Sequence, residues 1–451
     1  MLARLGGVLG DVLGDVLAHG VGSRQDLPLP FLHVVVGAAA AIAVSFVVLG
    51  LAWRTPQLLV QGAGTPLPRP VARVLDSPAL RWVLRAAVLA VTLLFALALV
   101  LGPDDVDNPA PGMFYVWLWA GLVPASLLLG PVWRVVSPLR TVHAGLATVL
   151  RVDREHGLLE LPARLGWWPG AAGLAAFVWL ELAAPGRATQ PVLQAWVGAY
   201  VAVHLVAGVL FGARWYTRGE GFEAVSDVVG RLSPLGRRED GVLVLRTPLD
   251  GAASLRPAPG LVALLCLLLG STMFDSLTSA TRYVRVAQSS GLPRVVVDTV
   301  VLAGVVGLVV LAYVVATRAA AGGDRGLRDV LPGELAHSLV PIAVGYLVAH
   351  YYSLLVLEGQ RTLALASDPL GTGADWFGTA DLSVSAALTD PAGVALLQVV
   401  AIVFGHVLGT VLAHDRALAL LPRGRAVAGQ VPLLLLMVAY TVAGLVLLFA
   451  G

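Results

Sequence analysis

Ten runs of about 20 mostly apolar residues divide this chain, and a run of that length crosses a bilayer as one helix. With 57% hydrophobic and only 13% charged residues, the chain lies outside the usual range of soluble globular proteins. The sequence therefore predicts an all-α fold, a polytopic transmembrane helix bundle of about ten spans. The predicted spans are 31–53, 80–102, 113–133, 168–186, 190–213, 258–278, 295–318, 334–357, 391–413 and 427–450.

The arginines alternate sharply between the two sides of the predicted bundle. The segments that follow spans one, three, five, seven and nine hold 23 of the 30 arginines, and the opposite side holds six. The positive-inside rule places the arginine-rich side in the cytoplasm. We therefore expect both ends of the mature chain to face outward, with a cytoplasmic loop at 214–259 and an outer loop at 358–390.

All 30 basic residues are arginine and none is lysine, which is typical of a GC-rich bacterium such as an actinobacterium. The expected location is the bacterial plasma membrane, with the lipid bilayer as the main partner. The net charge of +2 comes from arginines in short loops, so it indicates no nucleic-acid partner. The single cysteine, Cys266, excludes an intrachain disulfide and a CxxC metal or redox site.

Residues 1–18 resemble a secretory signal, with Arg4 at the charged end and a small-residue cleavage motif at 16–18. The acidic repeat at Asp11 and Asp15 departs from that pattern and leaves an uncleaved interfacial helix as the alternative. Residues 19–451 would then form a single transmembrane domain. Cleavage would expose His19, whose α-amine and imidazole could chelate Cu²⁺.

The predicted span 334–357 carries two histidines, a proline and three tyrosines. His337 and His350 are 13 residues apart, about 20 Å along a helix, so they cannot bind the same metal ion. Pro341 stands inside the predicted helix and removes a backbone hydrogen bond to His337. We therefore expect the helix to bend at Pro341, with His337 in an inner polar patch and His350 near the outer face.

Polar residues on other spans fall at the same depth as His350. Glu181 and Asp275 lie in the outer parts of their spans, with Asp298 close to them in depth, whereas His204 and His406 lie in the inner half with His337. Ionisable groups at membrane depth are expensive and usually functional. A cluster of carboxylates and histidine could hold a divalent ion such as Zn²⁺ or Cu²⁺ and activate water, or it could relay protons.

From this pattern, Asp275, Glu181 and His350 are the predicted catalytic residues, and the same three residues with His19 are the predicted metal ligands. The outer loop contains Asp375 and Trp376 in a stretch rich in Gly and Asp, and these two residues could cap the outer cavity. The predicted substrate path is lined by His337, Tyr346, Tyr351, Asp375 and Trp376. The sequence has no HExxH, GxSxG or Walker A motif, so the soluble-enzyme templates give no assignment.

Six segments resemble actinobacterial multi-pass membrane proteins labelled fenitrothion hydrolase, which are similar to the membrane component of a heteromeric organophosphate hydrolase. They are spread over most of the chain: AHGVGSRQDLPLPFL, GLVPASLLLGPVWRVVSPLRTVH, FVWLELAAP, RLSPLGRREDGVLVLRTPLDG, GSTMFDSLTSATRY and SDPLGTGADWFGT. The resemblance implies attack of water on a phosphotriester. It assigns no catalytic residue, because no motif in these segments has an agreed catalytic role.

The leading hypothesis is an integral membrane hydrolase with an outward carboxylate–histidine site. The alternative is a transporter or metal-handling permease for a small molecule or ion, with a broken-helix path at His337 and Pro341. A third hypothesis is a structural subunit that binds a second membrane subunit, in which the histidines only clamp helices together.

Overall fold

The computed structural model describes residues 26–58 and 64–449. The predicted signal segment and His19 lie outside the described residues. The fold is all-α, as the sequence predicts, apart from one small antiparallel sheet. Its strands are β1 (Thr65–Pro66), β2 (Leu235–Arg237) and β3 (Leu243–Leu245), with β3 in the centre. Thr65 pairs with Leu245 and Gly236 pairs with Val244, which joins the segment before the second span to the loop after the fifth.

Within the described part of the chain, nine helical segments are long and apolar enough to cross a membrane. Their main helices are α2 (Phe31–Ala52), α4 (Pro78–Leu101), η2 with α6 (Met113–Ala120 and Gly121–Leu129), α10 (Gln190–Phe211), α14 (Leu261–Thr278), α16 (Arg294–Ala320), α18 (Leu339–Leu365), α19 (Pro391–Leu420) and α20 (Val431–Leu448). The predicted span at 168–186 is the helix α9 (Trp168–Leu182), whose 15 residues are shorter than the length required of a span.

Shorter helices connect or flank these segments. They are α3 (Arg69–Leu75), α5 (Ala110–Gly112), α7 (Trp133–Val136), α8 (Pro138–Leu150), η3 (Ala163–Leu165), α11 (Arg214–Gly219), α12 (Gly221–Gly230), α13 (Pro248–Ala253), α15 (Thr281–Ser289), α17 (Arg325–Glu334), η4 (Ala336–Ser338) and η5 (Ala428–Gln430). All ten residues of α12 are buried, although the sequence places this segment in a loop.

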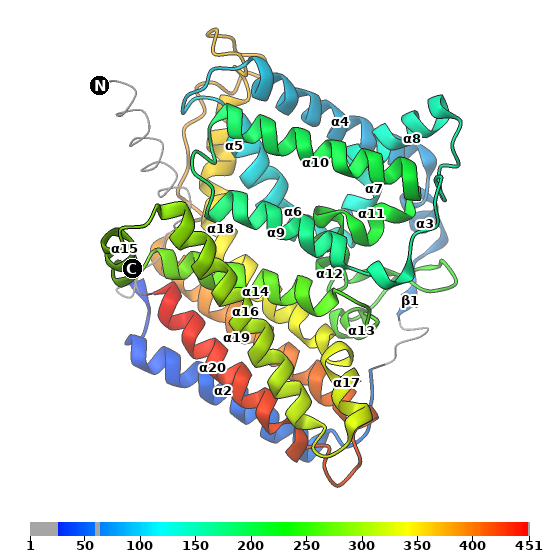
Figure 1. Cartoon of the computed structure of the whole chain (residues 1–451), viewed down its shortest axis with the longest axis vertical. Coiled ribbons are helices and arrows are strands. Elements are labelled where there is room, and N and C mark those ends of the chain that lie inside the picture. The colour runs from blue at the N-terminus through cyan, green and yellow to red at the C-terminus, as the bar shows by residue number, and fades with distance from the viewer. Residues whose placement is uncertain (1–25, 59–63, 450–451) are drawn as a thin grey trace.

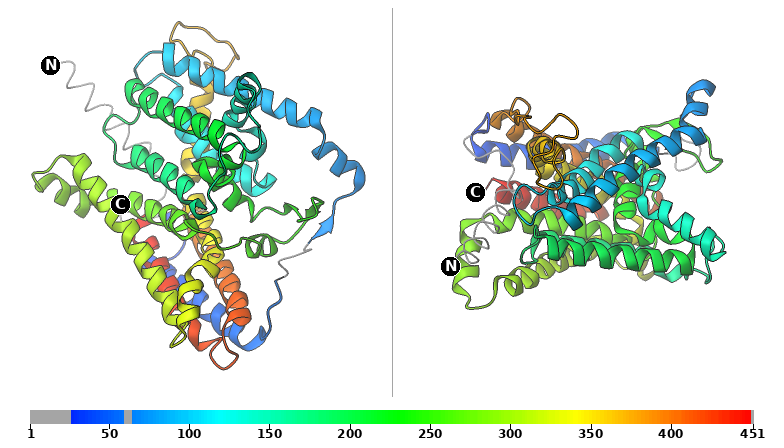
Figure 2. Two further views of the ribbon diagram at one scale, coloured as in Figure 1. Left: turned by 45° about the vertical axis from the view of Figure 1, so that its right-hand side comes forward. Right: turned by 90° about the horizontal axis from the view of Figure 1, so that it is seen from above.

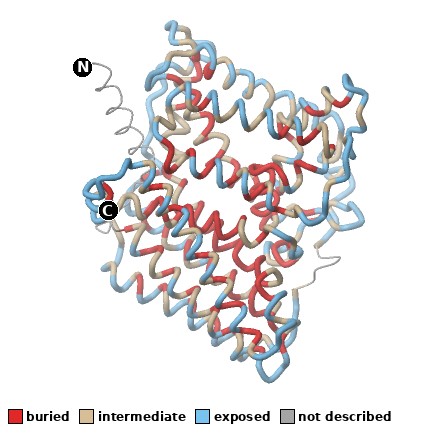
Figure 3. The backbone as a smooth tube through the Cα atoms, viewed as in Figure 1, coloured by how far each residue is buried: buried red, intermediate tan, exposed pale blue. Residues whose placement is uncertain are grey.

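The helices form two groups joined by a shared centre (Figures 1 and 2). One group contains α4, α8, α9 and α10, and the other contains α2, α16, α17, α19 and α20. Helices α14 and α18 pass between them, because α14 contacts α9 and α16 while α18 contacts η2 and α19. Buried residues concentrate along this central region (Figure 3). The outer helices expose large apolar side chains, including Leu32, Trp82 and Val300, as expected of lipid-facing surfaces.

The predicted bend at Pro341 is wrong, because Pro341 lies in the first turn of a helix and not in its middle. Helix α18 begins at Leu339, so Pro341 is its third residue, where a backbone N–H has no intrahelical partner. The chain instead breaks at the 3₁₀ turn η4, between α17 and α18. Helix α18 also continues to Leu365, so the outer loop, which was predicted to begin at residue 358, begins only after Leu365.

Helices α18 and α19 pack closely because small residues line their contact. A methyl group on Gly345 would lie 2.4 Å from the carbonyl oxygen of Ala401, and one on Gly405 would lie 2.4 Å from the carbonyl oxygen of Pro341. Gly405 and Gly409 form a GxxxG pair, which lets two membrane helices approach backbone to backbone. This contact fixes the register of α18 and therefore the position of the polar side chains it carries.

The third span contains eight residues of π-helix, η2, which is unusually long for this conformation. Pro124 follows within α6, and its ring has no N–H to offer the carbonyl of Ala120, the last residue of η2. The wider winding turns Tyr115 and Trp119 toward α9, where their rings lie 6.2 and 4.8 Å from the ring of Phe177.

Candidate functional site

Three helices that are far apart in the sequence bring the predicted catalytic residues to one place. Asp275 comes from α14, His350 from α18 and Glu181 from α9. His350 Nε2 and Asp275 Oδ2 are in direct hydrogen-bonding contact, and Asp275 is only 5% exposed. Asp275 is also close enough to Glu181 to interact with it electrostatically. The prediction from depth along the spans therefore selected Asp275 and His350, which are in contact. Asp298, predicted at a similar depth, bonds instead to Tyr283 and Arg294.

Glu181 is incompletely hydrogen-bonded. The hydroxyl of Tyr351 donates to its Oε1 atom over 3.1 Å. Its other oxygen, Oε2, is buried and has no hydrogen-bond partner among the described residues. Leaving a buried acceptor without a donor costs about 1 to 3 kcal/mol, and more for a charged group. Buried acceptors without a partner are rare in folded proteins, and a role in binding a proton or a ligand is one explanation for this oxygen.

Aromatic side chains enclose this group of residues, which we call the outer cluster (Glu181, Asp275, His350 and Tyr351). The ring of Trp119 packs 6.0 Å from that of Tyr351, and His350 packs 5.5 Å from the same tyrosine. The hydroxyl of Tyr115 donates to the backbone carbonyl of Arg187 over 2.9 Å. Because these rings keep the local dielectric low, charges in the outer cluster interact strongly with one another.

A metal ion needs more ligands than this geometry shows. Within residues 26–58 and 64–449, no group of three or more His, Cys, Asp or Glu side chains is placed to hold one. Asp275 and His350 would supply two donors, whereas zinc sites in proteins use three or four. His19, the fourth predicted ligand, lies outside the described residues. A bound Zn²⁺ or Cu²⁺ therefore stays a prediction.

The predicted substrate-path residues fall in three separate places. Tyr351 belongs to the outer cluster. Tyr346 is buried deeper along α18, where its hydroxyl donates to the carbonyl of Tyr440 over 3.1 Å. His337 is buried in η4 at the other end of the helix, with Nδ1 2.9 Å from the carbonyl of Glu334. His337 and His350 therefore belong to different clusters, as their spacing predicts.

Asp375 and Trp376 lie in the outer loop, and their hydrogen bonds are made within that loop. The carboxylate of Asp375 accepts from the hydroxyl of Ser367 and from the N–H groups of Thr379 and Ala380, the last two over 2.9 and 3.1 Å. The Ser367 hydroxyl and the Ala380 N–H hold the pKa of Asp375 below its usual range. The side chain of Trp376 is 50% exposed. A capping role for these two residues stays a prediction.

A line of buried polar residues on α19 extends from the depth of the outer cluster toward the arginine-rich side. Gln398, His406, Thr410 and His414 are all buried and follow spacings of eight, four and four residues, so they wind by about 160° around α19 over a rise of about 24 Å. His406 Nδ1 contacts the carbonyl of Ile402 over 2.8 Å and must donate to it, so Nε2 carries a lone pair. This nitrogen and Gln398 Oε1 have no partner among the described residues.

Only His406 of this line stood out in the sequence. The signal for two others was available, because spacings of four residues link His406 to Thr410 and Thr410 to His414. A single amide or hydroxyl in an apolar run is nevertheless common, so Gln398 and Thr410 carried little information by themselves.

A second polar network, which we call the inner network, surrounds the start of α12. Arg140 donates from Nε and Nη2 to the two carboxylate oxygens of Glu223, each over 2.6 Å. The carboxylate of Glu220 accepts from the Tyr200 hydroxyl, from the N–H groups of Phe222 and Glu223, and from the indole of Trp133. The sequence did not predict this network, because its two acids, Glu220 and Glu223, come from a segment that had no apolar run to mark it as buried.

Comparison with known protein families, with curated proteins and with solved structures finds no match for this chain.

Proposed function

We propose that this chain is a multi-pass membrane transporter that couples movement of a small solute or ion to proton exchange in the outer cluster. The observation that carries this proposal is the direct contact of His350 with Asp275, beside a Glu181 oxygen that has no partner. Titratable side chains at membrane depth are characteristic of ion pathways and proton relays. Histidine is suited to such a role, because its charge changes near neutral pH.

The chemistry follows from the three titratable groups. A proton on His350 would give a positive charge that offsets the negative charge of Asp275, its direct partner. Loss of that proton would leave Asp275 beside Glu181 without a counter-charge, which favours uptake of a proton or a cation by the two carboxyl groups. The Tyr351 hydroxyl donates to Glu181, and the Tyr351 ring packs against His350. Tyr351 therefore connects Glu181 to the pair formed by His350 and Asp275.

The polar line on α19 supports a route from the outer cluster toward the cytoplasm. Gln398 donates from its amide to the carbonyl of Ala349, the residue that precedes His350, over 3.1 Å. His406 follows about 12 Å farther along α19 with a free lone pair on Nε2. The break at η4 and the buried His337 lie at the arginine-rich end of α18, where such a route would leave the membrane.

Proton flux into liposomes tests this proposal. The purified chain would be reconstituted, and the internal pH followed with a trapped dye under an imposed potential, with and without external Zn²⁺ or Cu²⁺. We expect flux above that of protein-free vesicles, and its loss in Asp275→Asn and His350→Gln. The matched control is Tyr352→Phe, since Tyr352 donates to the carbonyl of Leu388 in the outer loop rather than into the cluster. Equal flux in wild type and in folded Asp275→Asn protein would sink the proposal.

Phosphotriester hydrolysis is the second proposal, and the same residue pair favours it. A carboxylate that holds an imidazole in place is the arrangement of a general base, which would activate water. A chromogenic phosphotriester, assayed with and without Zn²⁺, tests this activity, and His350→Gln should lower the rate by about 100-fold or more. A folded protein with neither flux nor turnover would favour the third hypothesis, a structural subunit of a larger membrane complex.

A further inference from the structure

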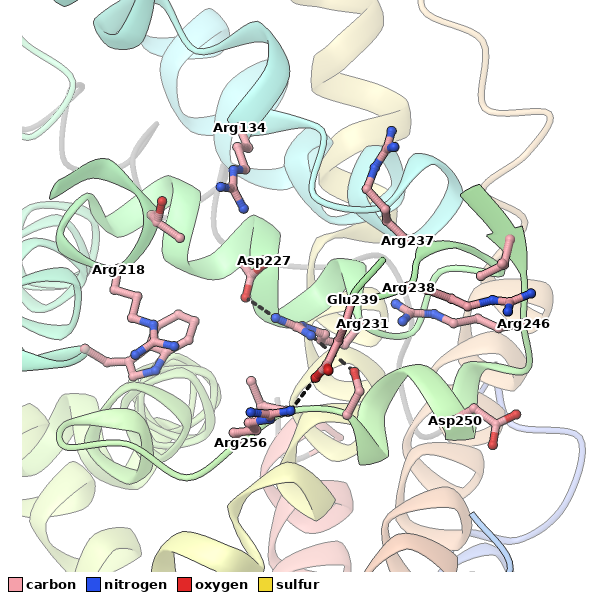
Figure 4. Close-up of a pocket in the computed structure, with 15 residues that line it drawn as sticks. Arg134, Arg218, Asp227, Arg231, Arg237, Arg238, Glu239, Arg246, Asp250 and Arg256 are labelled. Atoms are coloured by element: carbon pink, nitrogen blue, oxygen red, sulfur yellow. Dashed lines mark hydrogen bonds and ion pairs between the residues drawn. The ribbon is translucent and has the colours of Figure 1, made fainter. Parts of the chain in front are cut away.

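The arginine-rich side of the molecule contains a cavity of about 300 Å³ that the outer cluster does not involve (Figure 4). That volume is at the lower end of the range for small-molecule sites. Seven arginines and three acidic residues line it, which leaves the lining with four more positive than negative charges. The arginines are Arg134, Arg218, Arg231, Arg237, Arg238, Arg246 and Arg256, and the acids are Asp227, Glu239 and Asp250.

The acidic residues of this arginine pocket already have partners. Asp227 accepts from Arg231 over 3.1 Å, Glu239 pairs with Arg256, and Asp250 accepts from the hydroxyl of Thr247. Arg237 pairs outside the pocket with Asp76. Within the described part of the chain, the remaining four lining arginines make no ion pair with a carboxylate. These four are Arg134, Arg218, Arg238 and Arg246.

Three buried N–H donors that line the arginine pocket have no hydrogen-bond partner among the described residues: the indole Nε1 of Trp167 and the Nε atoms of Arg238 and Arg246. Trp167 is only 2% exposed, and the guanidinium of Arg218 lies 5.4 Å from its ring centroid. Buried donors are nearly always hydrogen-bonded in folded proteins. Three donors without an acceptor, in a pocket of excess positive charge, fit a ligand that supplies acceptor oxygens and negative charge.

The β2–β3 hairpin and two glycines hold this arrangement in place. Arg238 follows β2 and Arg246 follows β3, so the hairpin carries both side chains to the same pocket. A methyl group on Gly236 would lie 2.4 Å from Arg246 Nε, and one on Gly251 would lie 2.8 Å from it. The Arg246 guanidinium therefore occupies space that a side chain at Gly236 or Gly251 would fill. This close packing fixes the position of the guanidinium in the absence of a ligand.

Electrostatics in the arginine pocket favour an added anion. Burial, and next the positive charge of Arg231, lower the pKa of Arg246. A guanidinium stays charged in proteins even so, and the planar fork of arginine matches the oxygens of a phosphate group. An anion bound here would offset the repulsion among the arginines as well as accept from the three free donors.

We propose that the arginine pocket binds a phosphate-bearing anion, either a free phosphorylated solute of the cytoplasm or the headgroup of an anionic phospholipid in the inner leaflet. Both sources present the same chemistry, phosphate oxygens that accept hydrogen bonds and carry negative charge. Both are available on the side of the membrane where the positive-inside rule places these loops. The pocket stands on its own contacts and does not depend on the function proposed for the outer cluster.

Binding of inorganic triphosphate to the purified, delipidated chain is the first test. Isothermal titration at low and high salt should give affinity that falls as salt rises, because screening weakens the attraction. Arg246→Gln and Arg238→Gln should each weaken binding by about tenfold or more, since a hydrogen bond to a charged group contributes that much. Arg246→Lys, which keeps the charge without the fork, should lose less. Trp167→Phe removes only the N–H and should weaken binding by a smaller factor.

The matched control is Arg164→Gln, an exposed arginine that does not line the arginine pocket, and it should bind triphosphate like the wild type. A second arm uses nanodiscs with phosphatidylglycerol and phosphatidylcholine, followed by native mass spectrometry of retained lipid. Triphosphate binding without lipid retention would identify a free phosphorylated solute. Retention of phosphatidylglycerol that Arg238→Gln and Arg246→Gln abolish would identify a headgroup. If folded wild-type protein binds neither probe, or binds both equally in all variants, the proposal is overturned.

Discussion

The outer cluster and the inner network are both buried groups of charged and polar residues, but they differ in how fully they are hydrogen-bonded. In the inner network, both oxygens of Glu223 accept from Arg140, and Glu220 accepts from four donors. In the outer cluster, Glu181 accepts from Tyr351 alone, and one of its oxygens has no described partner. A saturated network holds a structure in one arrangement, whereas an unsaturated one retains the capacity to bind something else.

Burial of charge is therefore a poor guide to function by itself. The inner network holds as many charged groups as the outer cluster and is buried as deeply. Its two carboxylates, however, already accept hydrogen bonds from protein donors and offer a ligand no free acceptor. It fastens α12 against α7 through Trp133 and against α8 through Arg140, two helices in which few apolar residues are buried. Breaking it should therefore affect stability first, and breaking the outer cluster should affect activity first. Four predictions test that separation, from the largest expected effect to the smallest.

Glu223→Ala should have the largest effect on stability. It leaves Arg140 buried without its carboxylate, and removal of one partner of a buried ion pair costs about 3 to 5 kcal/mol. Thermal unfolding in detergent should show a clearly lowered midpoint. The control is Glu239→Ala, because Glu239 and Arg256 are 66% and 64% exposed and such a pair contributes less than about 1 kcal/mol. Equal midpoints for the two variants would show that the inner network is not structural.

Asp275→Asn should reverse that pattern and affect activity more than stability. The amide keeps the shape of the side chain and a hydrogen bond to His350, so the loss of stability should be about 1 to 2 kcal/mol. Proton flux or turnover should fall by about 100-fold, the lower end of what a positioned proton-transfer group contributes. Both quantities are measured on the same preparation. A variant that unfolds as readily as Glu223→Ala while its folded fraction keeps full activity would place the outer cluster with the structural networks.

Glu181→Gln probes the unsatisfied oxygen directly. An amide nitrogen at that position has no described acceptor either, so the free energy of unfolding should change by no more than about 1 kcal/mol. Activity should nevertheless be lost, because glutamine cannot take up or release a proton. The pH dependence of flux, compared between wild type and Glu181→Gln, checks this expectation. An unchanged pH profile would remove Glu181 from the site and leave Asp275 and His350 as the exchanging pair.

Much of the architecture could be predicted from the sequence, because the bilayer imposes simple rules. Apolar runs predicted ten spans, of which nine are long and apolar enough among the described residues, and depth along each span grouped Glu181, Asp275 and His350 before any contact was known. Such reasoning works when the constraint is one-dimensional, along the membrane normal. It fails for α12, whose burial depends on packing between α6, α7 and α9 rather than on its own composition.

Pro341 shows the other limit of the sequence. A proline within an apolar run indicates either a bend within a helix or the start of a helix. The two cases differ in whether the residues before the proline continue the helix. The 3₁₀ turn at 336–338 decides between them, and it is stabilised by hydrogen bonds from Ser338 to Leu335 and from His337 to Glu334. Those local hydrogen bonds compete with continuation of the helix. The free-energy difference is small, and the hydropathy of the sequence carries no information about it.

Asp375 extends the comparison to a saturated carboxylate on the surface, where the expected effect is smallest. Its pKa is lowered by the hydroxyl of Ser367 and by backbone N–H groups, so the folded loop holds a proton less tightly than the unfolded chain. The resulting stabilisation of the loop is complete above the unfolded pKa near 4 and is lost as pH falls through the lower folded value. Hydrogen exchange at residues 367–380 should therefore accelerate below about pH 4 after correction for the intrinsic rate. Asp375→Asn should reduce that dependence, and Asp368 should account for the remainder, because the N–H groups of Thr372 and Gly373 also lower its pKa. An unchanged acid transition in Asp375→Asn would contradict the prediction.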